Sequence, residues 1–150
     1  MLLITIVDEL EQRLRKSKQQ LSRDATVLSY FFCQGTNRDL NSSTAILRGL
    51  IFLLAIQHPP LLSHLRERYD SAGSKLFDES NSFFALSAIL ECMLHDKSLK
   101  KAYLVLDALD ECLFGQERLL HLIVHHATTS PHVKWIVSSR NRPEIEQHLC

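Results

Sequence analysis

Three carboxylates follow an apolar run in the stretch AYLVLDALDECLFGQ, residues 102–116. Asp107 ends the run, and Asp110 and Glu111 come shortly after it. A carboxylate close to a protein core is unfavourable unless a cation or hydrogen-bond donors compensate its charge. Carboxylate oxygens are ligands that Mg²⁺ prefers, and this ion often takes only one or two of them from a protein. The stretch therefore predicts a magnesium site at Asp107, with Asp110 and Glu111 placed to polarise a water molecule.

A second apolar run, VKWIVSS at 133–139, is followed at once by Arg140. In open parallel sheets, ligands bind at the edge where the strands have their carboxyl ends. If both runs are strands of such a sheet, Arg140 lies near the three acids and could bind a phosphate group. A purely structural alternative is that Asp110 and Glu111 cap the following segment and Arg140 pairs with one of them.

The elements that must position these residues can be predicted from apolar spacing and capping residues. Short runs rich in β-branched and aromatic residues predict strands at 26–33, 102–107 and 133–139. The last two are near-continuous apolar runs, which indicates strands buried on both faces. The alternation of helices and strands predicts an α/β fold with a parallel sheet covered by helices. Helices are expected at 2–20, 39–58, 60–73, 81–96, 115–127 and 142–149.

Composition narrows the classes of function. The 150 residues suit one domain, and a formal net charge of zero argues against a nucleic-acid partner. No stretch reaches the roughly 18 apolar residues of a membrane span, so we expect no membrane association. The four cysteines form no C-x-x-C pair, which indicates reduced thiols and a cytoplasmic location.

Three histidines of the expected helix at 115–127 are candidate zinc ligands. His121 and His125 are one turn apart, His126 follows, and Glu117 lies one turn before His121. A zinc site needs a third ligand and usually a carboxylate behind its histidines. No H-E-x-x-H pattern supplies this set, so we expect the histidines to lie on the surface.

The stretches YLVLDALDEC and VKWIVSSRNRPEIE resemble the Walker B and sensor segments of NACHT domains, which are P-loop NTPases of the STAND class. In particular they look like those of fungal NOD-like receptors with a nephrocystin-like domain. The similarity continues through residues 27–62 and 76–94. We judge that it covers the whole chain, so that residues 1–150 form a partial NACHT domain.

This resemblance implies roles for the acids and the arginine. Asp107 becomes the acid on the magnesium side, Asp110 and Glu111 the pair near the attacking water, and Arg140 the sensor of the terminal phosphate. The implied cofactors are Mg²⁺ and ATP or GTP. The implied function is a nucleotide-driven switch in self/non-self recognition, heterokaryon incompatibility or immune-type signalling.

The departure from the family pattern is equally specific. The phosphate-binding loop G-x-x-x-x-G-K-[ST] does not occur among these 150 residues, and AGSK at 72–75 is not such a loop because it follows no expected strand. The stretch MLLITIVDEL resembles the helix that follows the loop in the family. We therefore expect a chain that starts just after the Walker A motif and lacks the first strand and the P-loop.

Two expectations follow for activity and partners. Without the P-loop, the chain alone should neither hold nor hydrolyse nucleotide, although its family hydrolyses ATP or GTP. The strand at 133–139 should have an open edge, which favours self-association or pairing with homologous NACHT proteins. The main alternative function is thus a non-enzymatic interaction fragment. A metal-dependent phosphohydrolase or nuclease would need a second acidic motif at another strand end, which the sequence does not contain.

Overall fold

Three parallel strands form the centre of the molecule. The computed structural model describes residues 2–18, 25–72 and 82–149. Within them, β1 (Ala25–Phe32), β2 (Leu99–Asp107) and β3 (Val133–Val137) form one sheet in the order β1-β2-β3. Both pairs of neighbours are parallel. The predicted α/β class, the parallel pairing and the central place of the strand that carries Asp107 are confirmed.

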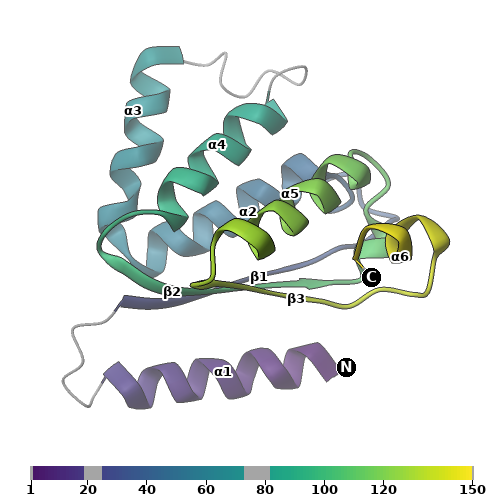
Figure 1. Ribbon diagram of the computed structural model, residues 1–150, viewed down its shortest axis with the longest axis horizontal. Coiled ribbons are helices and arrows are strands. Elements are labelled where there is room, and N and C mark those ends of the chain that lie inside the picture. The colour runs from purple at the N-terminus through teal and green to yellow at the C-terminus, as the bar shows by residue number, and fades with distance from the viewer. Residues whose placement is uncertain (1, 19–24, 73–81, 150) are drawn as a thin grey trace.

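Helices cover the sheet unequally. On one face lie α2 (Ser43–Gln57), α4 (Ser82–Leu94) and α5 (Gln116–Thr129), and α3 (Leu62–Ala72) packs on α4 (Figure 1). On the other face lies α1 (Leu2–Lys18). The last helix, α6 (Pro143–Leu149), packs beside α5. The expected helix ends at Gly73 and Asn81 lie outside the described residues.

The helix α2 fits closely against β1. It begins where Ser42 Oγ accepts a hydrogen bond from the Ala45 N–H at 3.2 Å, and it ends before a pair of prolines. A Cβ atom added at Gly49 would lie 2.5 Å from the ring of Phe31, so a larger residue would push the helix off the strand. This close approach explains a glycine within a helix, where it otherwise lowers stability.

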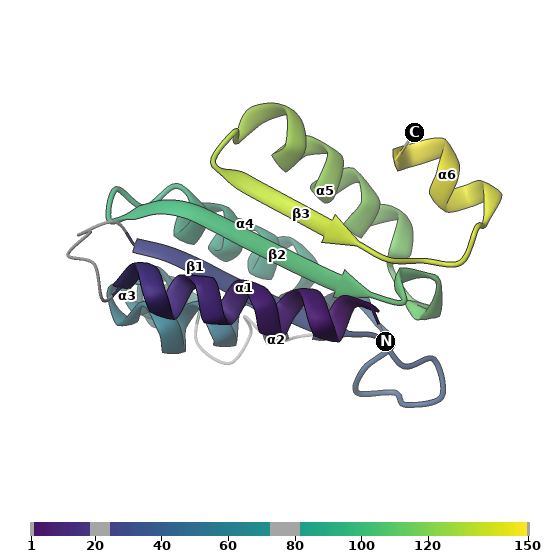
Figure 2. The ribbon, with the colours of Figure 1, turned by 90° about the horizontal axis from the view of Figure 1, so that it is seen from below.

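The apolar core is divided between the two faces of the sheet. The larger cluster fills the space between the sheet and α2, α4 and α5. The smaller one joins Val7 of α1 to Leu28 of β1 and Val105 of β2. Figure 2, seen from this side, shows α1 lying across β1 and β2 and leaving β3 largely uncovered.

The prediction that residues 133–139 form a fully buried strand is wrong. The strand ends at Val137, and only Val133 is buried, whereas Lys134 is exposed and the next three residues are partly buried. The physical reason is position: β3 pairs with β2 alone in the described chain, and α1 covers the other two strands. The open edge that the sequence predicted is therefore present, but it belongs to a half-covered strand.

The prediction of surface histidines on α5 is wrong for His126. This residue has no exposed surface, and neither ring nitrogen has a hydrogen-bond partner. Leu119, Ile123 and His126 recur at helical spacing on the buried side of α5, which brings the imidazole onto Trp135 of β3 at a centroid distance of 5.9 Å. Burial lowers the pKa of His126 to about 4, because the charged form is poorly solvated there.

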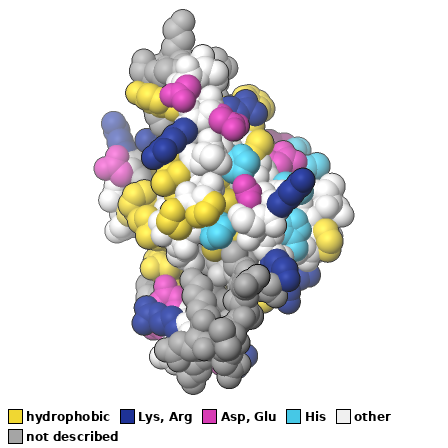
Figure 3. Space-filling view, turned by 90° about the vertical axis from the view of Figure 1, so that its left-hand side faces the viewer, with side chains coloured by type: hydrophobic (Ala, Val, Ile, Leu, Met, Phe, Trp, Pro, Cys, Tyr) yellow, Lys and Arg dark blue, Asp and Glu magenta, His cyan; other side chains and the backbone are white. Residues whose placement is uncertain are grey.

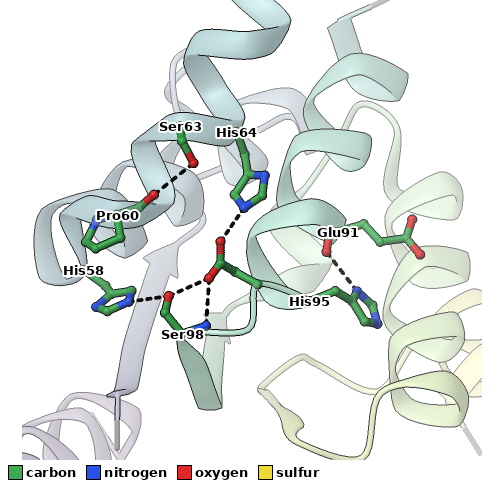
Figure 4. A network of polar contacts seen from close by, with 8 residues as sticks. His58, Pro60, Ser63, His64, Glu91, His95 and Ser98 are labelled. Atoms are coloured by element: carbon green, nitrogen blue, oxygen red, sulfur yellow. Dashed lines mark hydrogen bonds and ion pairs between the residues drawn. The ribbon is translucent and has the colours of Figure 1, made fainter. Parts of the chain in front are cut away.

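A polar network fastens the edge at which the strands begin. His58 Nε2 lies 2.8 Å from Ser98 Oγ, which itself donates to Asp96 at 2.5 Å (Figure 4). Asp96 also lies 2.6 Å from His64 Nε2 on α3, and these hydrogen bonds, those from Ser98 first, lower the pKa of Asp96 to about 2. Figure 3 shows this face, where histidines lie among both acidic and basic side chains. It is remote from the strand ends that carry the predicted site.

None of the described helices is long and apolar enough to span a bilayer.

Candidate functional site

A tight turn after β2 carries the predicted acids. Ala108 has a left-handed backbone, with φ 58° and ψ 50°, which few residues other than glycine adopt. Its N–H donates to Ser138 Oγ at 3.0 Å, and the Leu109 N–H donates to the Ser138 carbonyl at 2.9 Å. A 3₁₀ turn over Leu109–Glu111 follows. The chain that leaves β3 therefore holds the acidic turn in place.

Asp107 is bound to both neighbouring strand ends. Its carbonyl accepts a hydrogen bond from the Cys33 N–H at 3.0 Å, on the side of β1. Its side-chain Oδ1 accepts a hydrogen bond from Ser138 Oγ, on the side of β3. One carboxylate oxygen is thus oriented by the protein, and Oδ2 is the oxygen left to take a cation. Ser138 belongs to the apolar run VKWIVSS, but only the packing of the two strand ends reveals it as the residue that orients Asp107.

Asp110 is the most enclosed acid of the site, with 8% of its surface exposed. Its Oδ1 accepts a hydrogen bond from the Arg140 N–H at 3.1 Å, and its Oδ2 lies 3.8 Å from Arg140 Nε. The Arg140 side chain is 84% exposed, so this ion pair is weak and the guanidinium stays accessible to a ligand. The structural alternative, in which Arg140 pairs with one of the two acids, is therefore observed for Asp110. The main contact of this pair is the hydrogen bond from the Arg140 backbone N–H.

Glu111 is placed differently from Asp110. It is partly buried, and a Cβ atom added at Gly35 would be in ordinary contact with its side chain at 3.7 Å. The loop after β1 thus lies against Glu111, whereas Asp110 is engaged by the segment after β3. No ion pair joins Glu111 to another residue within the described ranges, so its carboxylate is free to act on a ligand or a water molecule.

These residues surround one open hollow of about 350 Å³ at the carboxyl edge of the sheet. It is lined by the three acids and the arginine predicted from the sequence, together with the turn residue and two serines: Asp107, Ala108, Asp110, Glu111, Ser138, Ser139 and Arg140. The structure therefore brings all four predicted site residues together, although they come from segments about 30 positions apart.

A comparison of the sequence with known families matches residues 1–140 to the family described as Nephrocystin 3, N-terminal. The chain belongs to this family. The match includes both strand ends of the hollow and excludes α6. The resemblance to fungal NACHT proteins of the nephrocystin-like kind, first drawn from the segments around Asp107 and Arg140, is thereby confirmed.

A curated relative of this nephrocystin-like chain is the "Vegetative incompatibility protein HET-E-1" of Podospora anserina. The two are 46% identical over 149 residues, which is 99% of this chain and 10% of the relative. The chain thus spans about a tenth of the length of that protein. No solved structure matches the chain.

Two buried thiols adjoin the acids: Cys33, whose N–H donates to the Asp107 carbonyl, and Cys112, which follows Glu111 in the chain. Burial raises the pKa of Cys33 to about 12 and that of Cys112 to about 11, and the neighbouring acids add to the effect at Cys33. A thiol is nucleophilic only as its thiolate. Both cysteines therefore stay protonated at neutral pH.

A larger cavity of about 570 Å³ shares no lining residue with the acidic hollow. Arg38 after β1, Arg48 of α2 and Arg118 of α5 line it, and the guanidinium of Arg118 lies over the rings of Phe83 and Phe84 at 5.8 and 5.7 Å. The sequence does not predict this cavity, because its arginines are separated in the chain and share no motif.

Proposed function

We propose that this chain is part of a NACHT-type signalling NTPase, a nucleotide-driven switch in fungal self/non-self recognition or immune-type signalling. The observation that carries the proposal is the gathering of Asp107, Asp110, Glu111 and Arg140 around one hollow at the carboxyl edge of a parallel sheet. The name of the relative HET-E-1 supports a role in vegetative incompatibility. Free thiols at Cys33, Cys92 and Cys112 support a cytoplasmic location.

The donors in the hollow fit a hard divalent cation. Asp107 offers a carboxylate that Ser138 holds in one orientation, and oxygen ligands suit Mg²⁺. In this proposal Asp107 would hold the metal, whose positive charge would offset that of the phosphates of ATP or GTP. Glu111 orients or deprotonates the attacking water, and Asp110 assists while fixing the segment of Arg140. The exposed guanidinium of Arg140 binds the terminal phosphate.

The 150 residues alone should not retain nucleotide, because they contain no phosphate-binding loop. A hydrogen bond to a charged group contributes about 1.5–3 kcal/mol. Three such bonds to the phosphates would therefore contribute about 4.5–9 kcal/mol, or about three to six powers of ten in affinity. The phosphates would supply most of the oxygen ligands of Mg²⁺, and Asp107 would add only one or two. The magnesium site is therefore weak without the phosphates.

The open edge of β3 favours a second candidate function, a non-enzymatic fragment that pairs with homologous NACHT proteins. Within the described residues β3 has one neighbour, and three of its five residues are only partly buried. An apolar strand with free backbone groups can template pairing with another chain.

Calorimetry with ATP and Mg²⁺ tests the main proposal on two proteins. The first is the 150-residue chain, and the second is a fusion in which a strand and a G-x-x-x-x-G-K-T loop precede it. We expect no site of micromolar affinity in the first and a magnesium-dependent site in the second. A tight site in the first, or no site in a folded fusion, would contradict the proposal.

A further inference from the structure

A second group of potential metal ligands lies outside the acidic hollow, between α5 and α6. Glu117 and His121 lie one turn apart on α5, and His148 comes from α6. Each offers one ligand atom, and these atoms all lie within 4.8 Å of one another. The third ligand that the α5 sequence lacks is thus supplied by the folding of α6 against α5, which Figures 1 and 2 show side by side.

The ring of His148 is already set for coordination. Its Nδ1 lies 2.7 Å from the Glu144 carbonyl oxygen, which can only accept, so Nδ1 carries the proton. The neutral ring therefore has its lone pair on Nε2. Histidine ligands of metals commonly donate their other N–H to a carbonyl or carboxylate in this way, which fixes the tautomer and the ring orientation.

The surroundings leave the three ligands free to close on an ion. Glu117 and His121 are exposed, so rotation of these two side chains toward His148, whose ring is partly buried and held by Glu144, costs little. The neighbouring Arg118 has its guanidinium over two phenylalanine rings, and no ion pair of Glu117 occurs in the described residues. Tetrahedral ligands at 2.0–2.1 Å from zinc are about 3.3 Å apart. The ligand atoms therefore need to approach one another by at most about 1.5 Å.

We propose that Glu117, His121 and His148 bind one Zn²⁺ ion, with water as the fourth ligand. Two imidazoles and one carboxylate suit zinc or a similar transition metal, whereas Mg²⁺ and Ca²⁺ prefer oxygen ligands alone. The ion joins α6 to the first turn of α5, which carries Glu117. Because α6 begins at Pro143, three residues after Arg140, the bound metal restrains the segment that carries the arginine of the acidic hollow. Zinc binding itself requires no nucleotide.

Zinc titration of the untagged 150-residue chain tests this site, with binding followed by calorimetry. We expect one ion per chain, no competition from Mg²⁺, and an affinity lowered about tenfold or more in both His121→Ala and His148→Ala. His125→Ala is the matched control: it lies on the same helix, but its Nε2 is 3.5 Å from Glu91 rather than near the cluster. This variant should bind zinc like the original chain.

A spectroscopic measurement separates this site from adventitious binding to cysteine. Co²⁺ bound by nitrogen and oxygen ligands shows visible absorption without the intense thiolate-to-metal band, and His121→Ala should abolish it. Cooperative thermal unfolding of each variant establishes that it is folded, and His121→Ala suffices if His148→Ala loosens α6. The proposal is overturned by no zinc binding, by a thiolate spectrum, or by binding that survives in a folded His121→Ala chain.

Discussion

Ser138 and Asp107 are joined across two neighbouring strands, with the serine Oγ donating to the carboxylate Oδ1. The same oxygen of Ser138 accepts the N–H of Ala108 at 3.0 Å. One hydroxyl therefore orients the predicted metal ligand and also supports the left-handed residue that turns the chain toward Asp110 and Glu111. The site depends on the contact between β2 and the chain leaving β3, rather than on the acidic motif alone.

Replacing this hydroxyl should weaken the fold at the site. In Ser138→Ala, both Asp107 Oδ1 and the Ala108 N–H lose a partner, and we expect the free energy of unfolding to fall by about 1–2 kcal/mol. Ser139→Ala is the control, because Ser139 donates only to the exposed carbonyl of Arg140, and it should change stability by less than about 0.5 kcal/mol. Urea unfolding of the two variants measures the difference. Equal effects would show that the Ser138 contact has no special role.

Glu111→Gln should separate hydrolysis from binding in the fusion that supplies a P-loop. The amide keeps the shape but cannot take a proton, so turnover should fall by about 10²–10⁴-fold while ATP affinity is kept. Glu67→Gln, on the exposed side of α3, is the control and should leave both unchanged. Steady-state phosphate release and ATP titration give the two quantities. Unchanged turnover in Glu111→Gln would mean that Glu111 is not the base.

The buried His126 should make stability fall in mild acid. Its pKa is lower in the folded state, about 4, than the ordinary value of 6.5, so the unfolded state binds more protons between these values. The stability present above pH 6.5 is therefore lost as the pH falls toward 4, by about 3 kcal/mol from this residue.

His126→Leu tests this dependence, since leucine has no proton to bind. Urea unfolding at several pH values should give a flatter profile for His126→Leu than for the original chain between pH 6.5 and 4. His125→Gln, a change on the exposed side of α5, should keep the original profile. A profile that His126→Leu leaves unchanged would assign the acid sensitivity to other groups.

The order of the strands along the chain and the residues gathered at their carboxyl ends were predictable, because apolar runs such as YLVLD and turn residues are local signals. The burial of β3 was not, since it depends on which strands α1 crosses, and Val7 pairs with Leu28 and Val105 rather than with Trp135. The burial of His126 was not predictable for the same reason. A histidine in a helix is expected to be exposed unless the residue that packs on it, here Trp135, is known. His148 and His121 are 27 positions apart, so only the packing of α6 reveals them as partners.

The open edge of β3 should make the 150-residue chain self-associate. Free backbone donors and acceptors beside partly exposed Trp135, Ile136 and Val137 can pair with a second strand. Light scattering after size exclusion should therefore show oligomers or aggregates. A fused N-terminal strand should restore a monomer, whereas a fused segment of the same composition in scrambled order should not. A stable monomer of the unfused chain would contradict this prediction.

The central claim, that Asp107 holds the metal of a bound nucleotide, is tested most directly by titrating Mg²⁺ against ATP binding in the fusion that supplies the P-loop. Asp107→Ala should remove most of the magnesium dependence and lower affinity about tenfold or more when Mg²⁺ is present, with little change when it is absent. Asp70→Ala, an exposed change on α3, should behave like the parent protein. If a folded Asp107→Ala protein kept the magnesium dependence of its parent, the acidic edge of this sheet would not be the metal site.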